Sequence, residues 1–408
     1  MKSKHYCILD LGSTKFILIL AITKKNRIIN IYDEVIPQHD LIRKGIVLNA
    51  ERFLTLLDKA LEHLERKSNI YIDSIYVNIP ASEVSLKEIK TFTVLNHGLN
   101  KVVSLSDLKK IKRDAELLGI DSEEEILESN PLSYILDNQE GIINPLGMYG
   151  RKLGVVLSIL CGSSNYINNL RRLLSQIGKN IKGVYLAGKT SYYLITFGSK
   201  SLSKEVLFDV GSELSQVFLF REANLVKLET INWGGNNLTE RIMQRFHLDW
   251  QTAENLKINY AKVIGQEQTD KEILAEKNGR FFSLNQSSID EIVNSEVRIF
   301  CEELKKSLGQ DLKEIENIFV IGKTALLEGF LEFLEMELSI PVKLGYLSPQ
   351  VSLFSPQIGS YLKNNFLDYL GSLGMLLYLV TQSEEPSSHH NLLARFFYKI
   401  KQVYQEYF

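Results

Sequence analysis

Two short turns carry the side chains in this sequence that are best suited to chemistry. The stretch ILDLGS (8–13) places Asp10 before a Gly-Ser turn, and LFDVGS (207–212) places Asp209 before a second turn of the same kind. The backbone N–H groups of a tight Gly/Ser turn form a concave anion site, and an Asp beside it can hold a hydrated Mg²⁺ ion. The two turns therefore predict a site for the phosphates of a nucleotide, in a cleft between two halves of the chain.

A third stretch, GVYLAGKT (183–190), matches the pattern G-x-x-x-x-G-K-[ST] of nucleotide-binding phosphate loops. Such a loop needs a preceding strand, flexible residues between its two glycines, and a helix that opens at the Lys. Here the intervening residues, Val184 to Ala187, are typical of a buried strand instead. We therefore interpret GVYLAGKT as a strand that ends at Gly188, with a helix that starts at Lys189, and not as a phosphate loop.

The elements around these stretches repeat in two halves. YLAGKT (185–190) returns as FVIGKT (319–324), so each half has an Asp turn between two strands and, later, a buried strand ending in Gly-Lys-Thr. This order predicts a duplicated α/β unit, although two hairpins that share letters by chance would give the same repetition. Hydrophobic spacing predicts helices at 49–67, 105–118, 122–129, 165–178, 325–338 and 368–380.

The composition narrows the classes of protein. The 408 residues are enough for roughly two to three domains. A net charge of −2 without a basic stripe argues against nucleic acid as a partner. Cys7, Cys161 and Cys301 lie far apart, form no metal-ligand spacing and suit a reducing cytoplasm. No apolar run approaches the ~20 residues that span a bilayer, and the N-terminus predicts a strand, not a signal peptide.

Over nearly its whole length the sequence resembles the family of the bacterial actin-like division protein FtsA. LDLGSTKF (9–16) resembles the first phosphate loop of the actin/Hsp70/hexokinase superfamily, and NWGGNNLTERI (232–242) resembles a helix start in the second half. The most specific match, YILDNQEGIINPLGMYGRKLGV (134–155), resembles the family's own 1C subdomain. The resemblance implies an α/β, actin-like (ribonuclease H-like, duplicated) fold with two lobes around a nucleotide cleft, the 1C subdomain and a C-terminal amphipathic helix.

The same resemblance implies the domain boundaries. The first lobe would consist of subdomain 1A (1–82, 161–190 and 346–380) and subdomain 1C (83–160). The second lobe would consist of subdomain 2A (191–235 and 290–345) and subdomain 2B (236–289). The chain would end in a linker (381–390) and an amphipathic membrane-targeting helix (391–408).

The resemblance also implies a set of site residues. TAENLKINYA (252–261) resembles the helix whose Glu and Lys face the nucleoside, and FVIGKTALLEGF (319–330) resembles the adenosine motif. ATP and Mg²⁺ are then the implied cofactors, with Asp10 and Asp209 as the metal ligands. The implied nucleotide-binding residues are Asp10, Gly12, Ser13, Thr14, Lys15, Asp209, Gly211, Ser212, Gly235, Glu254, Lys257 and Gly322.

The second phosphate loop departs from the family pattern Asp-x-Gly-Gly-Gly-Thr-x-Asp. Glu213 replaces a glycine and would bring a carboxylate near the terminal phosphates, where like charges ~4 Å apart repel by ~4 kcal/mol at an effective dielectric constant near 20. Gln216 replaces the carboxylate that would order the attacking water, and Lys323 puts a side chain where the backbone should approach the base. We therefore expect weak or no ATP hydrolysis. Whether ATP is bound stays open, because Glu213 could point away or be bridged by Mg²⁺.

The C-terminal segment predicts membrane contact. The polar stretch TQSEEPSSHH (381–390) is typical of a flexible linker. At about 100° per residue, the apolar face of the following segment is formed by Leu393, Phe396, Phe397, Ile400, Val403, Tyr404, Tyr407 and Phe408. An aromatic, locally basic helix is typical of the membrane interface, and the alternatives are packing on the core or in a partner's groove. One copy would bind weakly and reversibly, so polymerisation would supply avidity.

The resemblance implies a role in the bacterial divisome. Such a protein would tether a polymer of the tubulin homologue FtsZ to the inner face of the cytoplasmic membrane at the septum. It would contact membrane lipids and other divisome proteins, self-associate into filaments and use ATP as a conformational ligand. A PilM-like scaffold of a pilus or secretion platform is one alternative, against which the terminal segment argues. A sugar kinase or ATPase of the same superfamily is another, against which the altered second phosphate loop argues.

Overall fold

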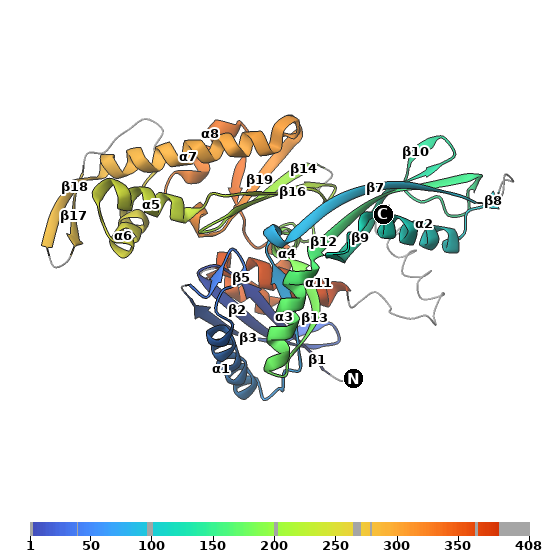
Figure 1. Cartoon of the computed structure of the whole chain (residues 1–408), viewed down its shortest axis with the longest axis horizontal. Coiled ribbons are helices and arrows are strands. Elements are labelled where there is room, and N and C mark those ends of the chain that lie inside the picture. The colour runs from blue at the N-terminus through green and yellow to red at the C-terminus, as the bar shows by residue number, and fades with distance from the viewer. Residues whose placement is uncertain are drawn as a thin grey trace.

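The computed structural model describes residues 3–38, 40–95, 101–199, 203–263, 271–277, 280–363 and 366–382. Its two lobes lie one above the other, each built on a five-stranded sheet (Figure 1). In order across it, the first sheet contains β3 (Arg27–Pro37), β2 (Lys15–Lys24), β1 (Lys4–Leu11), β6 (Ser74–Ile79) and β13 (Asn180–Leu186). The second contains β16 (Asn224–Ile231), β15 (Ser215–Arg221), β14 (Lys204–Val210), β19 (Ile315–Ile321) and β20 (Val342–Leu344).

The two sheets repeat one topology. β1 runs antiparallel to β2 and parallel to β6, and β14 runs antiparallel to β15 and parallel to β19. The register repeats as well, because Asp10 lies opposite Ile17 and Asp209 lies opposite Gln216, just before the two hairpin turns. The duplicated, actin-like α/β fold expected from the sequence is confirmed.

Helices cover both faces of the first sheet. On one face lie α1 (Ala50–Ser68) and α3 (Ser164–Gln176), and on the other lie α4 (Ala187–Ile195) and α11 (Leu370–Gln382). Apolar residues recur in α1 every three or four positions, so one side of this helix is buried against the sheet, as its sequence predicts.

The second sheet is covered by the long helix α7 (Gln286–Leu308) and by α8 (Phe330–Leu338) (Figure 1). Beyond them lie α5 (Gly235–Phe246), α6 (Trp250–Tyr260) and the hairpin of β17 (Glu272–Lys277) and β18 (Arg280–Asn285). The remaining short elements of the two lobes are β4 (Ile42–Arg43), β5 (Ile46–Val47), η1 (Ala81–Glu83), η2 (Gly309–Glu314), η3 (Lys323–Leu326), α9 (Pro349–Phe354), α10 (Pro356–Gly359), η4 (Ser360–Lys363) and η5 (Phe366–Asp368).

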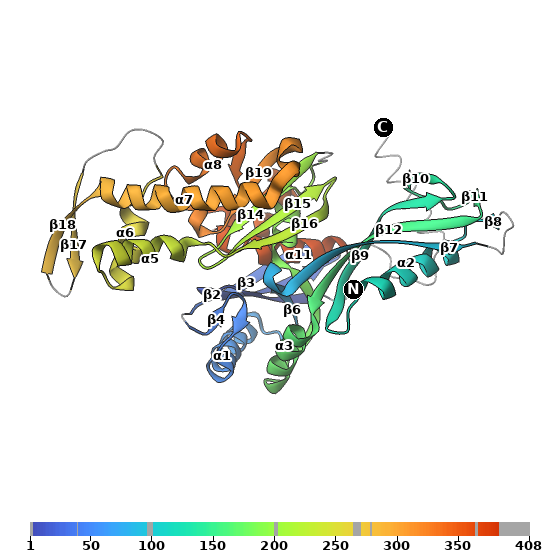
Figure 2. The ribbon, with the colours of Figure 1, turned by 45° about the horizontal axis from the view of Figure 1, so that its top comes forward.

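An inserted unit between β6 and β13 projects away from both lobes (Figure 1 and Figure 2). Its antiparallel sheet has the order β10 (Gln139–Ile142), β9 (Glu124–Leu136), β12 (Lys152–Ser163) and β7 (Val84–Val94), and β8 (Lys101–Val102) pairs with β11 (Tyr149–Gly150). The helix α2 (Leu105–Gly119) packs on this sheet so closely that a Cβ at Gly119 would lie 2.6 Å from the side chain of Ile159.

The helix expected at 122–129 is wrong, because most of these residues belong to β9, which pairs with β12. The acidic side chains resemble those of a helix N-terminus in sequence, but they have partners across the sheet. The carboxylate of Glu124 accepts hydrogen bonds from Ser85 Oγ (2.7 Å) and Lys87 Nζ (2.6 Å). Pairing with a distant strand therefore overrides the local helical pattern.

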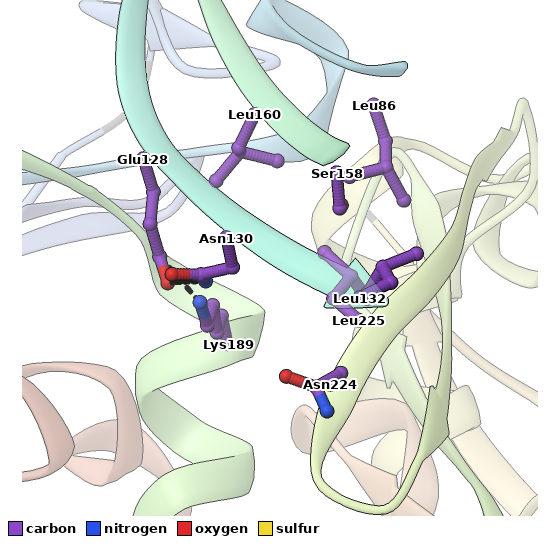
Figure 3. Close-up of a pocket in the computed structure, with 9 residues that line it drawn as sticks. All are labelled: Leu86, Glu128, Asn130, Leu132, Ser158, Leu160, Lys189, Asn224 and Leu225. Atoms are coloured by element: carbon purple, nitrogen blue, oxygen red, sulfur yellow. Dashed lines mark hydrogen bonds and ion pairs between the residues drawn. The ribbon is translucent and has the colours of Figure 1, made fainter. Parts of the chain in front are cut away.

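GVYLAGKT forms the end of β13 and the start of α4, as its interpretation requires. The strand ends at Leu186 and the helix begins at Ala187, two residues earlier than expected. Lys189 lies on the side of α4 that faces the inserted unit and donates a hydrogen bond to Glu128 of β9 (Figure 3). The lysine that completes the phosphate-loop pattern therefore fastens the inserted unit to the first lobe.

The two lobes share part of one core. The ring of Tyr192 in α4 stacks on Phe220 of β15, with ring centroids 3.6 Å apart. Gly188 of the same helix lies against Phe218, where a Cβ would come within 2.0 Å of the ring. Helices of the first lobe therefore pack directly on the sheet of the second.

A carboxylate fixes the approach to α11. Asp33 of β3 accepts hydrogen bonds from the hydroxyl groups of Tyr361 (2.8 Å) and Tyr369 (2.7 Å). Tyr369 directly precedes α11, so the start of this helix is tied to the edge strand of the first sheet.

The predicted C-terminal linker and terminal helix fall almost entirely outside the described residues. α11 ends at Gln382, and the apolar face proposed for 391–408 lies in the part of the chain that the structure does not describe. Its membrane role stays a prediction. Among the residues that are described, no helix is both long enough and apolar enough to cross a membrane.

Gly188→Ala should lower the free energy of unfolding by about 1–3 kcal/mol, because the added methyl group would overlap the ring of Phe218 in a packed core. Adding Phe218→Leu should recover part of this loss, since the smaller side chain leaves room for the methyl group. Urea unfolding of the two single variants and the double variant measures the coupling. If the changes in the free energy of unfolding of the two single variants simply add in the double variant, the two residues do not press on each other.

Candidate functional site

A cleft with a cavity volume of about 770 Å³ lies between the two lobes, a size typical of small-molecule sites. Its wall contains the two Asp turns, the start of α5, the second half of α6 and the chain that follows β19. The structure brings to this wall all of the residues that the sequence proposed for nucleotide binding: Asp10, Gly12, Ser13, Thr14, Lys15, Asp209, Gly211, Ser212, Gly235, Glu254, Lys257 and Gly322.

The two Asp turns have the same backbone geometry. Gly12 N donates a hydrogen bond to Lys15 O (3.0 Å), and Gly211 N donates one to Leu214 O (3.0 Å). A Cβ at Gly12 would lie 2.8 Å from Lys15 O, and a Cβ at Gly211 would lie 2.9 Å from Leu214 O. Each turn therefore requires glycine at its first position, because the backbone folds back so closely that a Cβ would overlap the carbonyl oxygen of the residue three positions later.

The second turn is supported from behind by its own lobe. Gly235 N, at the start of α5, donates to Gly211 O (3.0 Å), and Thr324 Oγ1 donates to the same oxygen (3.1 Å). Gly322 follows β19 with φ +87°, and a Cβ there would lie 2.3 Å from Val210 O. Only glycine lets the chain approach the turn this closely.

The first turn is held by Gln38, whose side chain is 3 % exposed. Its Nε2 donates hydrogen bonds to Gly12 O (3.1 Å), Ser13 O and Ile42 O (3.1 Å). Its Oε1 accepts from Leu41 N (2.9 Å) and Ile42 N (3.1 Å). One amide thus joins the turn to β4. Sequence reasoning missed this residue, because an isolated Gln carries no local signal.

Asp10 and Asp209 are partly buried carboxylates of the cleft wall with raised pKa values. Burial raises the pKa of Asp10 to about 6, while a hydrogen bond from Asn78 and the charge of Lys15 oppose the shift. Burial and the neighbouring charge of Asp10 raise the pKa of Asp209 to about 6. A divalent cation would relieve this repulsion, so the pair fits a hydrated Mg²⁺ ion. No cluster of three or more His, Cys, Asp or Glu suited to a metal occurs in the described ranges, so water or a bound ligand would supply the other contacts.

Glu254 and Lys257 link α6 to the start of α5. Lys257 Nζ donates to Glu254 Oε2 (2.7 Å), Thr239 Oγ1 (2.9 Å) and Gly235 O (3.1 Å). Burial lowers the pKa of Lys257, and the bond to Glu254 opposes this shift. The two charges therefore compensate each other at the cleft wall.

Glu213 does not stand in the cleft as an uncompensated charge, which corrects the expectation of simple repulsion. Its Oε1 accepts a hydrogen bond from Arg43 Nε (2.9 Å), and its Oε2 accepts one from Lys44 N (3.0 Å). Both partners belong to the first lobe, whereas Glu213 belongs to the second. The residue that replaces a family glycine therefore joins the two lobes.

Two further polar contacts cross the cleft, and the sequence analysis did not find them. Gln216 Oε1 accepts a hydrogen bond from Ala81 N (3.2 Å), so this side chain is engaged by the first lobe. Asp368 forms ion pairs with Lys15 of the first turn and with Lys323 (3.2 Å) after β19. Asp368 lies far from both lysines in the sequence, and no local pattern marks it.

The duplicated sheets around one cleft define an actin-like protein. The structure superposes on a protein of the "PilM-PilN type IV pilus biogenesis complex" with a TM-score of 0.63 at 14% identity, covering 93% of this chain and 99% of the other. It also superposes on MreB 5 of Spiroplasma citri bound to AMPPNP with a TM-score of 0.55 at 10% identity, covering 94% and 98%. These likenesses show the shared fold.

Comparisons of sequence identify the family. The model described as "Cell division protein FtsA" matches residues 206–362, and the model described as "SHS2 domain inserted in FTSA" matches residues 71–161. Cell division protein FtsA of Pseudomonas aeruginosa is 23% identical, with 83% of this chain and 82% of the relative covered. That of Streptococcus pneumoniae is 21% identical, with 93% and 84% covered. This chain belongs to the FtsA family.

Asp209→Asn should raise the free energy of unfolding at pH 7 by about 1–3 kcal/mol and change it little at pH 4. The folded-state pKa of Asp209 is about 6, above the ~3.9 of an unfolded chain. Its stabilising contribution is therefore complete below about pH 4 and is lost as the pH rises through 6.

Denaturant unfolding from pH 4 to pH 7 in EDTA measures this difference. The exposed Glu222 provides the control, since Glu222→Gln should show no such trend. An advantage of Asp209→Asn that grows as the pH falls would contradict the assignment.

Gln38→Ala should lower the free energy of unfolding by about 2 kcal/mol or more, because it leaves buried backbone groups of the first turn and β4 without partners. Thermal or urea unfolding tests this result. Gln176→Ala, at an exposed position of α3, is the matched control and should stay within about 0.5 kcal/mol of the wild type. Equal effects of the two substitutions would show that Gln38 does not hold the turn.

Proposed function

We propose that this chain is an FtsA-type division protein that tethers a polymer of an FtsZ-like tubulin homologue to the inner face of the cytoplasmic membrane at the septum. The family models that match the inserted unit and most of the second lobe support a role in cell division. The observation that carries the tether is the apolar face of 391–408, which follows a polar stretch. The chain would also contact other division proteins.

Self-association is part of this proposal. A single amphipathic segment contributes little affinity, because its partly inserted side chains must offset the entropy of ordering it. Filaments of many copies would present many segments to one membrane and so bind with avidity. The filament would in turn hold the division polymer along the membrane surface.

We infer that the cleft binds ATP with Mg²⁺ as a conformational ligand and hydrolyses it weakly or not at all. The cavity volume, the paired anion-binding turns and the carboxylates of Asp10 and Asp209 support nucleotide binding. A ligand that contacts both turns would bias the angle between the lobes. Gln216 argues against efficient hydrolysis, because it carries no charge and its oxygen is bonded to Ala81 N.

The likeness to PilM concerns the fold, and PilM-type scaffolding is the less favoured function. The family matches point to division, and the terminal segment provides a direct route to the membrane surface. A pilus or secretion platform would leave that segment without a role.

Residues 391–408 should be required for binding to vesicles that contain anionic lipids. The full chain should sediment with the vesicles, and the chain truncated after residue 390 should stay in the supernatant. Phe396→Ser with Phe397→Ser should weaken binding about tenfold or more, because both positions fall on the apolar face of the helix that the sequence predicts. Gln402→Ser with Gln405→Ser, on the opposite face, is the matched control and should bind normally.

Purified FtsZ polymer added to the same vesicles tests the tether itself. FtsZ should sediment with vesicles only when the full chain is present. Sedimentation of the truncated chain with vesicles, or of FtsZ without the full chain, would count against the proposal.

A further inference from the structure

Two carboxylates of this chain bridge the lobes at the cleft. Glu213 reaches from the second lobe to Arg43 and Lys44 of the first, and its side chain is 16% exposed. Asp368, whose side chain is 9% exposed, binds Lys15 beside the first turn and Lys323 beside the second lobe's last strands. The chain therefore places two of its own carboxylates in contacts that join the two lobes at the cleft.

The position of the Glu213 carboxylate is the important detail. Its Oε2 accepts a hydrogen bond from Lys44 N at 3.0 Å, and the same N–H reaches Ser13 Oγ of the first turn at 3.2 Å. Glu213 itself lies in the second turn, between Gly211 and Leu214. Its carboxylate therefore lies between the two anion-binding turns, bonded to one backbone N–H and one guanidinium. A phosphate oxygen would use the same kinds of donor.

The other cations of the cleft are also engaged. Within the described part of the wall, each lysine has a polar partner: Lys15 and Lys323 bind Asp368, Lys44 binds Asn232, Lys257 binds Glu254, and Lys262 binds Glu328. A third phosphate group would thus bring additional negative charge next to Glu213 without meeting a lysine that lacks a partner. A diphosphate that does not reach the Glu213 carboxylate would leave its bridge to the first lobe in place.

We propose that Glu213 acts as an internal anion that takes the place of a terminal phosphate, so that this cleft binds a nucleoside diphosphate in preference to a triphosphate. The inference rests on the proposed binding of nucleotide in the cleft, and it makes ADP a tighter ligand there than the ATP named in that proposal. It also assigns a role to Arg43, which neutralises the internal carboxylate. Removing Glu213 should open the place for a third phosphate. Removing Arg43 should leave the Glu213 carboxylate without its cationic partner, so that it repels that phosphate more strongly.

Calorimetric titration with ADP and with the non-hydrolysable triphosphate AMPPNP, both with Mg²⁺, tests the preference on the full chain. The wild type should bind ADP at least about tenfold more tightly than AMPPNP, a ratio that corresponds to about 1.4 kcal/mol. Glu213→Gln and Glu213→Gly should bring the two affinities within about threefold, chiefly by tightening AMPPNP. Arg43→Gln should widen the ratio, and Glu222→Gln, an exposed charge on the next turn, should leave it unchanged.

A second measurement follows the bridge without any nucleotide. Exchange of the Lys44 amide hydrogen should be slow in the wild type and at least about tenfold faster in Glu213→Gly, because the carboxylate acceptor is removed and only the longer contact to Ser13 Oγ (3.2 Å) is left. Thermal unfolding of each variant shows that the fold is retained. An amide that exchanges equally fast in both proteins would overturn the bridge.

The titrations separate the two proposals. Binding of both nucleotides with equal affinity, or a ratio that Glu213→Gln does not change, would overturn the role of Glu213 and leave nucleotide binding intact. Absence of binding for both nucleotides in the wild type and in Glu213→Gly would overturn the proposed nucleotide function of the cleft, and the preference with it.

Discussion

Two hairpin turns from different halves of the chain must lie on opposite sides of one cleft, and the rest of the structure serves this constraint. Each turn is closed by one backbone hydrogen bond, from Gly12 N or from Gly211 N, in a space that admits no Cβ. Gln38 fastens the first turn to β4, and the start of α5 supports the second. Because α4 packs on β15 beneath them, the spacing of the turns is set by a core that both lobes share.

The two sheets repeat one backbone topology, but the side chains at equivalent positions differ. Lys189 and Lys323 complete the same Gly-Lys-Thr sequence, but they follow strands that are not equivalent, because β19 pairs with β14 as β6 pairs with β1, whereas β13 lies beyond β6. Lys189 binds the inserted unit, and Lys323 binds Asp368 in the cleft. At an equivalent position of the two hairpins, Glu213 stands where the first turn has Thr14. A duplicated fold offers equivalent backbone positions, but each position has different neighbours. Glu213 therefore makes a polar contact across the cleft from a position that the first turn fills with Thr14.

Patterns within short stretches of the sequence predicted most helices, the strands and the two turns. The features that they failed to predict depend on contacts between residues far apart in the sequence. The glycines of the two turns, the apolar spacing of α1 and the repeated Asp turns are local patterns, and they predicted a duplicated α/β unit with a cleft. The actin-like fold and the other wall residues, such as Glu254 and Lys257, were implied by the family resemblance. The helix expected at 122–129 failed because β12, which pairs with those residues, comes later in the chain. Asp368 and Gln38 carry no local signal. Glu213 was recognised as a charge but not as a bridge, because Arg43 lies 170 positions away.

The helix α11 gives the cleft a mechanical connection to the end of the described chain. It starts two residues after Asp368, its 13 residues span about 20 Å, and ten of them are buried. Tyr369, directly before the helix, donates a hydrogen bond to Asp33. The helix is therefore packed in the first lobe and held in place at the end that lies near the cleft. The last described residue, Gln382, is therefore fixed to the same body as the first turn. The chain after Gln382 therefore begins at a point that is fixed in the first lobe and moves together with it.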